Sequence, residues 1–457
     1  MAIIEKLAGA VSNWVWGPPM LILLFGTHIY LTIRLRFVQR YIFKGIKISL
    51  GRGREGAGDV SQFGALTTAL AATIGTGNIV GVATAVAAGG PGAILWMWLT
   101  GVFGIATKYS EGLLAVKYRV TTPRGLMAGG PMYVLERGLK VKWLGVVFAA
   151  LTAFAAFGIG NMVQANSIST LAHDTFAIDP WVTGTVMTVL TAVVILGGIK
   201  SIARVCERLV PVMALVYVVG CVVILLMHFG EIPAAVALIV RDAFSAQAAA
   251  GGFLGAGVMQ AMRFGIARGL FSNESGLGSA PIVAAAAQTK NPVRQALVSA
   301  TGTFWDTVVV CAMTGLVLVM SADWTKGLEG AALTRSAFQD LSSLGPVLLT
   351  FALLTFVFST ILGWSYYGEK AAEYLFGPGA VAPYRWLWVG AVMLGSVISL
   401  PLVWSFADIA NALMAVPNLV SLILLSGVLV AETRLYLWNG GLERSVDLGP
   451  SLEPPGD

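Results

Sequence analysis

Apolar residues occur along this chain in runs of about 20, and a run of that length can cross a bilayer as a helix. We identify eleven such runs, at 14–33, 62–88, 91–118, 143–171, 181–199, 206–229, 252–288, 293–321, 345–368, 385–404 and 407–431. Polar and charged residues concentrate between the runs. The pattern predicts an all-α integral membrane protein, with eleven transmembrane helices in a single domain over residues 1–457.

The predicted helices group as one, then five, then five. An alanine-rich stretch at 231–250 separates the two sets of five, which span 62–229 and 252–431. The helix at 14–33 precedes both sets, and residues 432–457 form a tail. Because five is odd, the second set must cross the membrane in the opposite sense to the first. The count therefore predicts an inverted repeat, although sequence identity between the halves is weak.

The positive charges support this order of helices. If the eleven helices alternate, 22 of the 29 Lys and Arg residues fall on one side of the membrane. Only Lys6, Arg241, Lys326 and Arg335 fall on the other side. Lys and Arg accumulate on cytoplasmic loops. We therefore expect a multi-pass protein of the cytoplasmic membrane, with its N-terminus outside and its C-terminus and tail in the cytoplasm.

The composition agrees with a membrane protein. The chain is 57% hydrophobic and 11% charged, whereas soluble domains carry about 25% charged residues. The net charge of +6 follows from the loop charges, so we expect no nucleic-acid partner. Cys206, Cys221 and Cys311 are isolated, and the three histidines are scattered, which argues against disulfides and metal clusters. No cleavable signal peptide is expected, because the charges around the first run follow it.

Two apolar runs contain residues that interrupt a helix. The first reads Thr-Ile-Gly-Thr-Gly-Asn-Ile-Val-Gly at 73–81, and the second reads Phe-Ser-Asn-Glu-Ser-Gly-Leu-Gly at 271–278. Each Gly costs about 1 kcal/mol relative to Ala in a helix. Broken backbone in hydrocarbon is tolerated only inside protein or along a cavity. Each set of five opens with its interrupted member, which is typical of the substrate site of a secondary transporter. Close helix packing through small residues would explain either stretch alone.

A broken helix presents free N–H groups to an anion and free carbonyls to a cation. A zwitterionic amino acid needs both. The N–H groups that we expect at its carboxylate belong to Gly75, Thr76, Gly77 and Asn78. The second break is expected to offer carbonyls to its ammonium group from Ser272, Asn273 and Gly276.

Two adjacent hydroxyls suggest a site for sodium, which prefers oxygen ligands. Ser359 and Thr360 lie in the apolar run 345–368, and carbonyls of residues 72–75 are candidate partners. Such hydroxyls also commonly bond to the carbonyl one turn earlier, and the sequence does not separate these alternatives. Trp364 follows Thr360 by four residues and shares its helix face. A tryptophan wall would limit the ligand to a small one.

Buried polar and ionisable residues supply further candidates. Amides at membrane depth face the protein interior, and we favour helix–helix bonding for Asn161 and Asn166. Ionisable residues at that depth are candidate functional residues, because burying a charge in the membrane is costly. Those that we single out are Lys108, Glu111, Arg268, Glu274 and Asp306.

These ionisable residues receive separate interpretations. Lys108 and Glu111 are spaced i, i+3, so we expect them to pair. Glu274 is expected to hold the second break open or to titrate with a coupling proton. Arg268, about one turn before that break, is a candidate outer gate.

The motifs resemble a known family. The segments at 69–85, 89–98, 108–111 (Lys-Tyr-Ser-Glu), 129–133 (Gly-Gly-Pro-Met-Tyr) and 269–281 closely resemble the alanine or glycine:cation symporter family, and the resemblance covers essentially the whole chain. It implies a LeuT-type fold with ten core helices in two inverted halves, and sodium-driven uptake of alanine or glycine. Leu95 departs from the aromatic residue common in the family.

The resemblance also implies roles for individual residues. It places the substrate carboxylate at Gly75–Asn78 and the amine beside the break 271–276, which includes Phe271, Ser272 and Gly276. It adds Gln164, Thr360 and Trp364 as the walls of a compact pocket. The sodium ligands that it implies are carbonyls near Ala72 and Gly75 and the hydroxyls of Ser359 and Thr360.

We therefore expect a sodium-coupled symporter of small neutral amino acids, alanine or glycine, that works as a monomer by alternating access and is not an enzyme. The alternative is a proton-coupled carrier in which Glu274 or Asp306 titrates. An enzyme is disfavoured because no span carries paired metal ligands or a Ser–His arrangement. A channel is disfavoured because there is no ring of like charges. Preference among alanine, glycine and serine, the enantiomer and the cation stoichiometry stay open.

Overall fold

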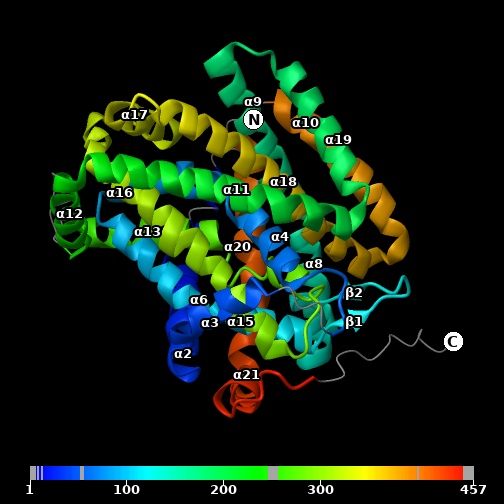
Figure 1. Ribbon diagram of the computed structural model, residues 1–457. Coiled ribbons are helices and arrows are strands. Elements are labelled where there is room, and N and C mark those ends of the chain that lie inside the picture. The colour runs from blue at the N-terminus through cyan, green and yellow to red at the C-terminus, as the bar shows by residue number, and fades with distance from the viewer. Residues whose placement is uncertain are drawn as a thin grey trace.

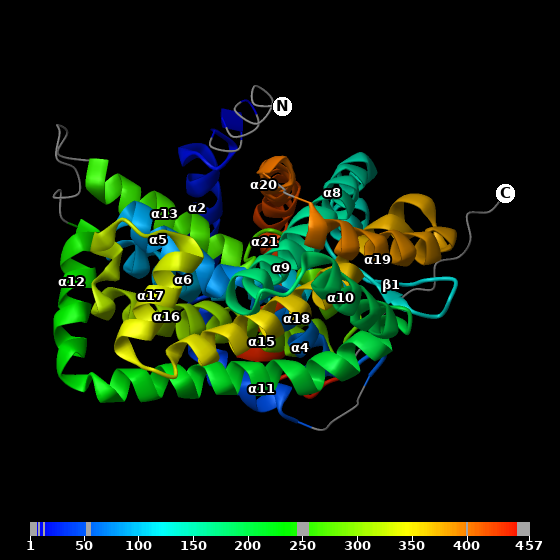
Figure 2. The same ribbon diagram turned by 90° about the horizontal axis from the view of Figure 1, so that it is seen from above.

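The computed structural model describes residues 7, 10, 11, 14–51, 56–244, 256–398 and 401–445. The described chain is mostly helical. A two-stranded antiparallel hairpin of β1 (Val120–Thr121) and β2 (Met127–Ala128) projects from one side of the helices in both views (Figures 1 and 2). Residues 252–255 of the predicted seventh helix and 446–457 of the predicted tail lie outside the described residues.

The helices alternate with short turns. The helices of the first half are α2 (Pro18–Arg34), α3 (Ile42–Ser49), α4 (Gln62–Thr73), α5 (Val80–Gly89), α6 (Ala93–Lys117), α7 (Pro131–Tyr133), α8 (Lys142–Ala155), α9 (Val163–Phe176), α10 (Pro180–Ile195), α11 (Gly198–Met227) and α12 (Ile232–Phe244). Those of the second half are α13 (Ala256–Asn273), α14 (Pro281–Ala284), α15 (Pro292–Thr303), α16 (Ala312–Ser321), α17 (Gly330–Leu341), α18 (Gly345–Phe376), α19 (Val381–Val397), α20 (Pro401–Leu424) and α21 (Ser426–Thr433). The 3₁₀ and π segments are η1 (Val38–Tyr41), η2 (Thr76–Asn78), η3 (Val134–Gly138), η4 (Ala156–Met162), η5 (Phe229–Glu231), η6 (Phe304–Cys311), η7 (Asp323–Lys326), η8 (Pro378–Ala380) and η9 (Arg434–Trp438).

Five helical stretches of the described chain are long and apolar enough to cross a membrane, and there are seven if two bent pairs each count as one. The five are Lys142–His173, Gly198–Met227, Pro292–Ser321, Gly345–Phe376 and Ala407–Leu424. The bent pairs are Pro18–Arg34 with Val38–Ser49, at 69°, and Gln62–Thr73 with Thr76–Gly89, at 62°. The predicted count of eleven spans, the inverted repeat and its boundaries stay predictions.

The structure adds elements to the connections that the apolar runs did not indicate. The alanine-rich separator at 231–250 contains a helix, α12, and a further helix, α17, lies in the connection between 321 and 345. The last two predicted runs divide before Pro401 rather than at 404–407, because Pro at the first helical position starts α20 there.

Local sequence explains several helix starts. Ser61 accepts a hydrogen bond from the amide of Gly64 at 2.8 Å and caps α4. Asp179 and Asn291 cap α10 and α15 in the same way, each followed by a Pro at the first helical position. Such side chains satisfy amides that have no partner within the helix.

The helices pack in two groups. In one group, α6 contacts α5, α13 and α15. In the other, α10 packs on α19, and α18 packs on α8 and α9. The helix α11 contacts both α4 and α18, and it runs along one edge of the molecule, with α12 at its end (Figure 2). The two breaks therefore belong to the first group and face α18 of the second.

Two π segments interrupt longer helices. The segment η4 joins α8 to α9 and contains Gly160, and η6 joins α15 to α16 and contains Asp306. Single π turns inside helices frequently occur at functional sites. All three cysteines are buried as free thiols.

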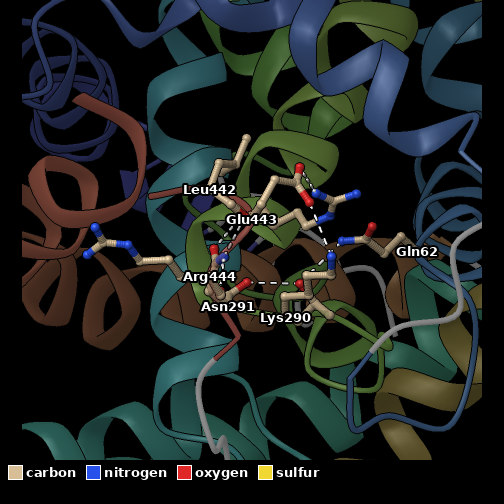
Figure 3. A network of polar contacts seen from close by, with 8 residues as sticks. Gln62, Lys290, Asn291, Leu442, Glu443 and Arg444 are labelled. Carbon is tan, nitrogen blue, oxygen red and sulfur yellow. Dashed lines mark hydrogen bonds and ion pairs between the residues drawn. The ribbon is translucent and has the colours of Figure 1, made fainter. Parts of the chain in front are cut away.

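The last described residues fold back onto the loop before α15 (Figure 3). Asn291 donates from Nδ2 to the carbonyls of Leu442 and Arg444, at 2.8 and 3.1 Å. On the other side of this loop, Gln62 donates to the Thr289 hydroxyl at 3.3 Å. The loop thereby joins the start of α4 to the C-terminal segment.

Glu443 adds charge to this contact (Figure 3). Its carboxylate lies 3.2 Å from the Lys290 ammonium and 2.6 Å from the Arg294 guanidinium. These two cations lower the pKa of Glu443 below its ordinary value.

Candidate functional site

The first break lies where α4 ends. Ile74 and Gly75 leave the helical conformation, one 3₁₀ turn (η2) follows, and α5 begins at Val80. The Gly75 amide donates to Asn78 Oδ1 at 2.9 Å. A Cβ at Gly75 would lie 2.6 Å from the Thr360 hydroxyl oxygen, so only glycine permits this approach of α4 to α18.

The second break follows α13. Glu274 has a φ of 55°, and Gly276 and Gly278 have φ values of 91° and 86°. A non-glycine residue in this left-handed region is strained, and such residues cluster at functional sites. The backbone is held by Glu111 of α6, whose Oε1 accepts from the amides of Gly276 and Gly278 at 3.0 and 3.1 Å. The sequence showed the break but not this carboxylate that supports it.

The expected ion pair between Lys108 and Glu111 is absent among the described residues. Glu111 instead binds the second break and the amide of Asn418, at 2.7 Å from Nδ2, while the buried Lys108 Nζ has no hydrogen-bond partner. The prediction was wrong because the freed amides of the break compete for the carboxylate. Lys108 interacts electrostatically with Glu111, Glu274 and Asp306 at longer range.

Asp306 connects the two breaks. Its Oδ1 accepts from Asn78 Nδ2 at 2.7 Å, and its Oδ2 accepts from the Ser272 hydroxyl at 3.0 Å. Thr307 donates to the same Oδ2 at 2.6 Å. One carboxylate of η6 thus binds a side chain from each interrupted helix, and both are buried.

A small cavity lies between the breaks and α18. Its water-accessible volume is about 20 Å³, enough for one or two water molecules, so it must widen to admit an amino acid. The predicted site residues that line it are Ala72, Gly75, Thr76, Gly77, Gln164, Phe271, Glu274, Thr360 and Trp364. The predicted residues that do not line it are Asn78, Ser272, Gly276, Ser359, Asp306 and Arg268.

Two buried amide oxygens at this cavity have no hydrogen-bond partner, Gln164 Oε1 and Asn411 Oδ1. The Gln164 amide nitrogen donates to the Ile159 carbonyl at 2.9 Å, which fixes the side chain. Unsatisfied buried acceptors are costly unless a ligand or water binds them. Sequence reasoning missed Asn411, although an amide within the apolar run 407–431 was the available signal. Asn161 and Asn166 instead donate to carbonyls of Trp388 and Ile398, as predicted.

The two hydroxyls of α18 meet carbonyls of α4. Ser359 Oγ lies 3.2 Å from the Ala71 carbonyl oxygen, and Thr360 Oγ1 lies 3.5 Å from that of Ile74. Both hydroxyls also donate to Phe356 of their own helix, at 2.8 and 3.0 Å. The bond to the carbonyl one turn earlier is therefore present, and sodium binding at these hydroxyls stays a prediction. The nearest carbonyls are those of Ala71 and Ile74, one residue earlier than the predicted Ala72 and Gly75.

Three other cavities adjoin the central one. A cavity of about 120 Å³ shares Phe271 and is lined by Arg268 and Asp408. The Arg268 guanidinium lies 5.9 Å from the Phe271 ring centroid. A cavity of about 440 Å³ shares Thr76 and includes residues of α17, while one of about 10 Å³ shares Thr73 and includes Lys108. Of these three cavities, the one beside α17 is the largest.

The arrangement has the chemistry of a ligand site rather than of a reaction centre. It offers backbone groups at a break, uncharged acceptors and one carboxylate around a small cavity. Among the described residues no group of three or more His, Cys, Asp or Glu side chains is placed to hold a metal ion. Oxygen atoms of hydroxyls and carbonyls are instead the ligands that an alkali cation prefers.

The known proteins that this chain resembles are all transporters or symporters. The sodium:alanine symporter family matches residues 1–445. An uncharacterized transporter of Haemophilus influenzae is 53% identical over 95% of this chain and 96% of its own length. The sodium/alanine symporter AgcS of Methanococcus maripaludis is 51% identical over 94% of this chain and 97% of its own. A probable sodium/glutamine symporter of Bacillus subtilis is 36% identical over 95% and 91%.

Proposed function

The chain belongs to the sodium:alanine symporter family, and from this premise we propose that it imports small neutral amino acids, alanine or glycine, with sodium. Membership makes it a transporter and not an enzyme. The substrate, the coupling ion and the site residues are proposals supported by the geometry of the central cavity.

The observation that carries the proposal is the pair of unpartnered oxygens, Gln164 Oε1 and Asn411 Oδ1, in a small cavity bounded by Trp364. An ammonium group supplies the donors that these oxygens lack. The substrate carboxylate would then lie at the amides of Thr76 and Gly77, since the Gly75 amide already donates to Asn78. Phe271 covers the ligand on the side of the second break.

The size of the cavity favours a small substrate. The cavity has about 20 Å³ available. A substrate with a methyl or hydrogen side chain needs only a modest outward movement of the walls. A long side chain such as that of glutamine requires Trp364 to leave its position. The size of the side chain therefore separates the proposed substrates, alanine and glycine, from the glutamine named for the Bacillus subtilis relative.

The local charge favours cation binding. Three buried carboxylates, Glu111, Glu274 and Asp306, interact with one buried ammonium, that of Lys108. Uncompensated buried charge is costly. A sodium ion at the hydroxyls of Ser359 and Thr360 and the ammonium group of the substrate both reduce the excess negative charge. Joint binding of ion and substrate would therefore stabilise the closed state.

We also propose the membrane arrangement predicted from the sequence: eleven spans, a LeuT-type five-plus-five inverted repeat, an outer N-terminus and a cytoplasmic tail. The packing supports the repeat, because the first two members of each set, α4–α6 and α13–α16, pack together. The third and fourth members, α8–α10 and α18–α19, form the other group. With this topology the wide cavity beside α17 faces outward. A monomer contains the whole proposed site.

One observation favours a second candidate, proton coupling. Glu274 lines the cavity, and its Oε2 accepts from the Ser279 hydroxyl, so a protonated carboxyl there would replace one cation. In this version the carrier would work in sodium-free buffer with an inward proton gradient.

Uptake of labelled alanine into proteoliposomes tests both versions. We expect accumulation with an inward sodium gradient at constant pH, and none when choline replaces sodium. Accumulation in choline that follows the proton gradient would instead establish the second candidate. Excess unlabelled glycine should compete, whereas glutamine should not. Competition by glutamine equal to that by glycine would contradict the proposed size limit.

A further inference from the structure

An apolar groove lies between α4 and its neighbours α3, α11 and η6, outside the substrate cavity. Its volume is about 300 Å³. It is lined by Ile46, Ser49, Leu50, Phe63, Leu66, Thr67, Leu70, Ile74, Val210, Pro211, Ala214, Leu215, Val218, Trp305 and Val310, from α3, α4, α11 and η6. The residues span α4 from its first turn to the start of the break.

The wall of this groove is mainly apolar. Its two hydroxyls already donate to carbonyls of their own helices, Ser49 to Ile46 at 2.8 Å and Thr67 to Phe63 at 3.0 Å. The groove is also open to its surroundings. Leu50 and Leu215 line it while remaining 67% and 63% exposed. In a membrane-spanning protein such a surface contacts hydrocarbon chains.

Positive charge gathers at one end of the groove. Arg204 and Arg208 precede Pro211 and Leu215 by seven residues each on α11, so they share the helix face that lines it. Lys47 lies on α3 between the lining residues Ile46 and Ser49. All three side chains are exposed.

These cations lie beside the start of α4. Glu207, between the two arginines, accepts from Ser61 at 2.8 Å just before α4 begins. That contact occupies the Glu207 carboxylate. Among the described residues, Lys47, Arg204 and Arg208 form no ion pair.

We propose that this groove binds an anionic phospholipid, with an acyl chain against α4 and α11 and the headgroup phosphate at Lys47, Arg204 and Arg208. Basic pockets between membrane helices recognise such headgroups, and an unpaired guanidinium suits a phosphate. The far end of the groove is formed by Leu70 and Ile74, and Ile74 immediately precedes Gly75. A bound chain therefore packs directly on the helix that contains the first break.

Native mass spectrometry of the purified full chain tests this directly, with phosphatidylglycerol and phosphatidylcholine of identical chains offered in equal amounts. We expect the wild type to retain phosphatidylglycerol preferentially. Ala214→Phe fills the groove and should lose the bound lipid. Lys47→Gln, Arg204→Gln and Arg208→Gln should each weaken the headgroup preference roughly fivefold, without transport entering the measurement.

Matched controls separate the groove from the general surface. Val212→Phe adds the same ring to an exposed position of α11 that does not line the groove, and Arg124→Gln removes an exposed cation elsewhere. Both should retain lipid as the wild type does. Val218→Phe is a second filling variant in case Ala214→Phe does not fold. Equal retention by the filling variants and Val212→Phe, or an unchanged headgroup preference in the glutamine variants, would overturn the proposal.

Discussion

Trp364 of α18 packs directly against Gly160 of η4. A Cβ at Gly160 would lie 2.2 Å from the Cβ of Trp364, a separation that real side chains do not adopt. Trp364 is 1% exposed and lines the central cavity. Trp364 can therefore occupy this position in the cavity wall only because residue 160 has no side chain.

Trp364→Ala should enlarge the cavity and admit larger amino acids such as valine. Removing a buried tryptophan also costs about 3–5 kcal/mol of stability, so folding must be checked by thermal melting. Competition of unlabelled amino acids against labelled alanine measures the size limit. Trp388→Ala is the control, because Trp388 is equally buried but does not line the cavity. A folded Trp364→Ala protein with an unchanged size limit would exclude Trp364 as the wall.

Gly160→Ala should have the opposite effect. The added methyl group pushes Trp364 toward the ligand, so alanine transport should weaken more than glycine transport. The ratio of the two KM values for uptake reports this change. Gly390→Ala is a suitable control, since nothing lies within 4 Å of a Cβ there. An equal rise in both KM values would indicate general damage rather than a narrowed pocket.

The double variant Ser359→Ala, Thr360→Ala should raise the sodium concentration needed for half-maximal uptake, because it removes two candidate oxygen ligands. Thr355→Ala removes a hydroxyl of the same helix that bonds only within that helix, and it should leave the sodium dependence alone. If the double variant keeps the wild-type sodium curve, the ion binds elsewhere.

Asp306→Asn should disturb both breaks together. The new amide places N–H groups opposite the donors of Asn78 or Ser272, and each unsatisfied buried group costs about 1–3 kcal/mol. We expect a lower melting temperature and weaker alanine binding. Ser272→Ala removes one of the three donors to this carboxylate and should be milder. If Ser272→Ala is as damaging as Asp306→Asn, the carboxylate is not the shared element.

The ion pairs of Glu443 predict a small dependence of thermal stability on pH. Lys290 and Arg294 lower its pKa in the folded protein, so its contribution is present above the unfolded pKa and is lost as the pH falls through the folded pKa. The wild type should therefore melt slightly above Glu443→Gln at neutral pH, and the curves should converge in acid. The side chain is 71% exposed, so the difference is modest. A pH-independent difference would rule out the ion pairs as its source.

The sequence predicted the parts of the site that depend on where a helix is interrupted and on the spacing of residues along a helix. Glycine and Asn78 in an apolar run indicated the first break, and Thr360 and Trp364 lie on one face of α18 because their spacing is helical. Asn411 was missed because a single amide in an apolar helix does not reveal which helix it faces. Glu111 was assigned to Lys108 by spacing alone, whereas its carboxylate binds the amides of the unwound residues Gly276 and Gly278, far along the chain.

The remaining differences have similar causes. The helices α12 and α17 are short and amphipathic. The pattern of long apolar runs therefore did not indicate them. Asp306 could be flagged as a buried acid, but its partners come from two helices that the sequence does not place beside it. Contacts between distant segments, rather than local propensity, supply this information.

The buried thiols of Cys206, Cys221 and Cys311 leave the native chain without an accessible target for maleimide reagents among its cysteines. A cysteine introduced at Thr350, in the wide cavity beside α17, would therefore be labelled selectively in an otherwise unmodified sequence. Site-directed spectroscopic probes can then be attached without first removing the native thiols, which keeps the buried packing intact while the surroundings of this cavity are followed with and without sodium.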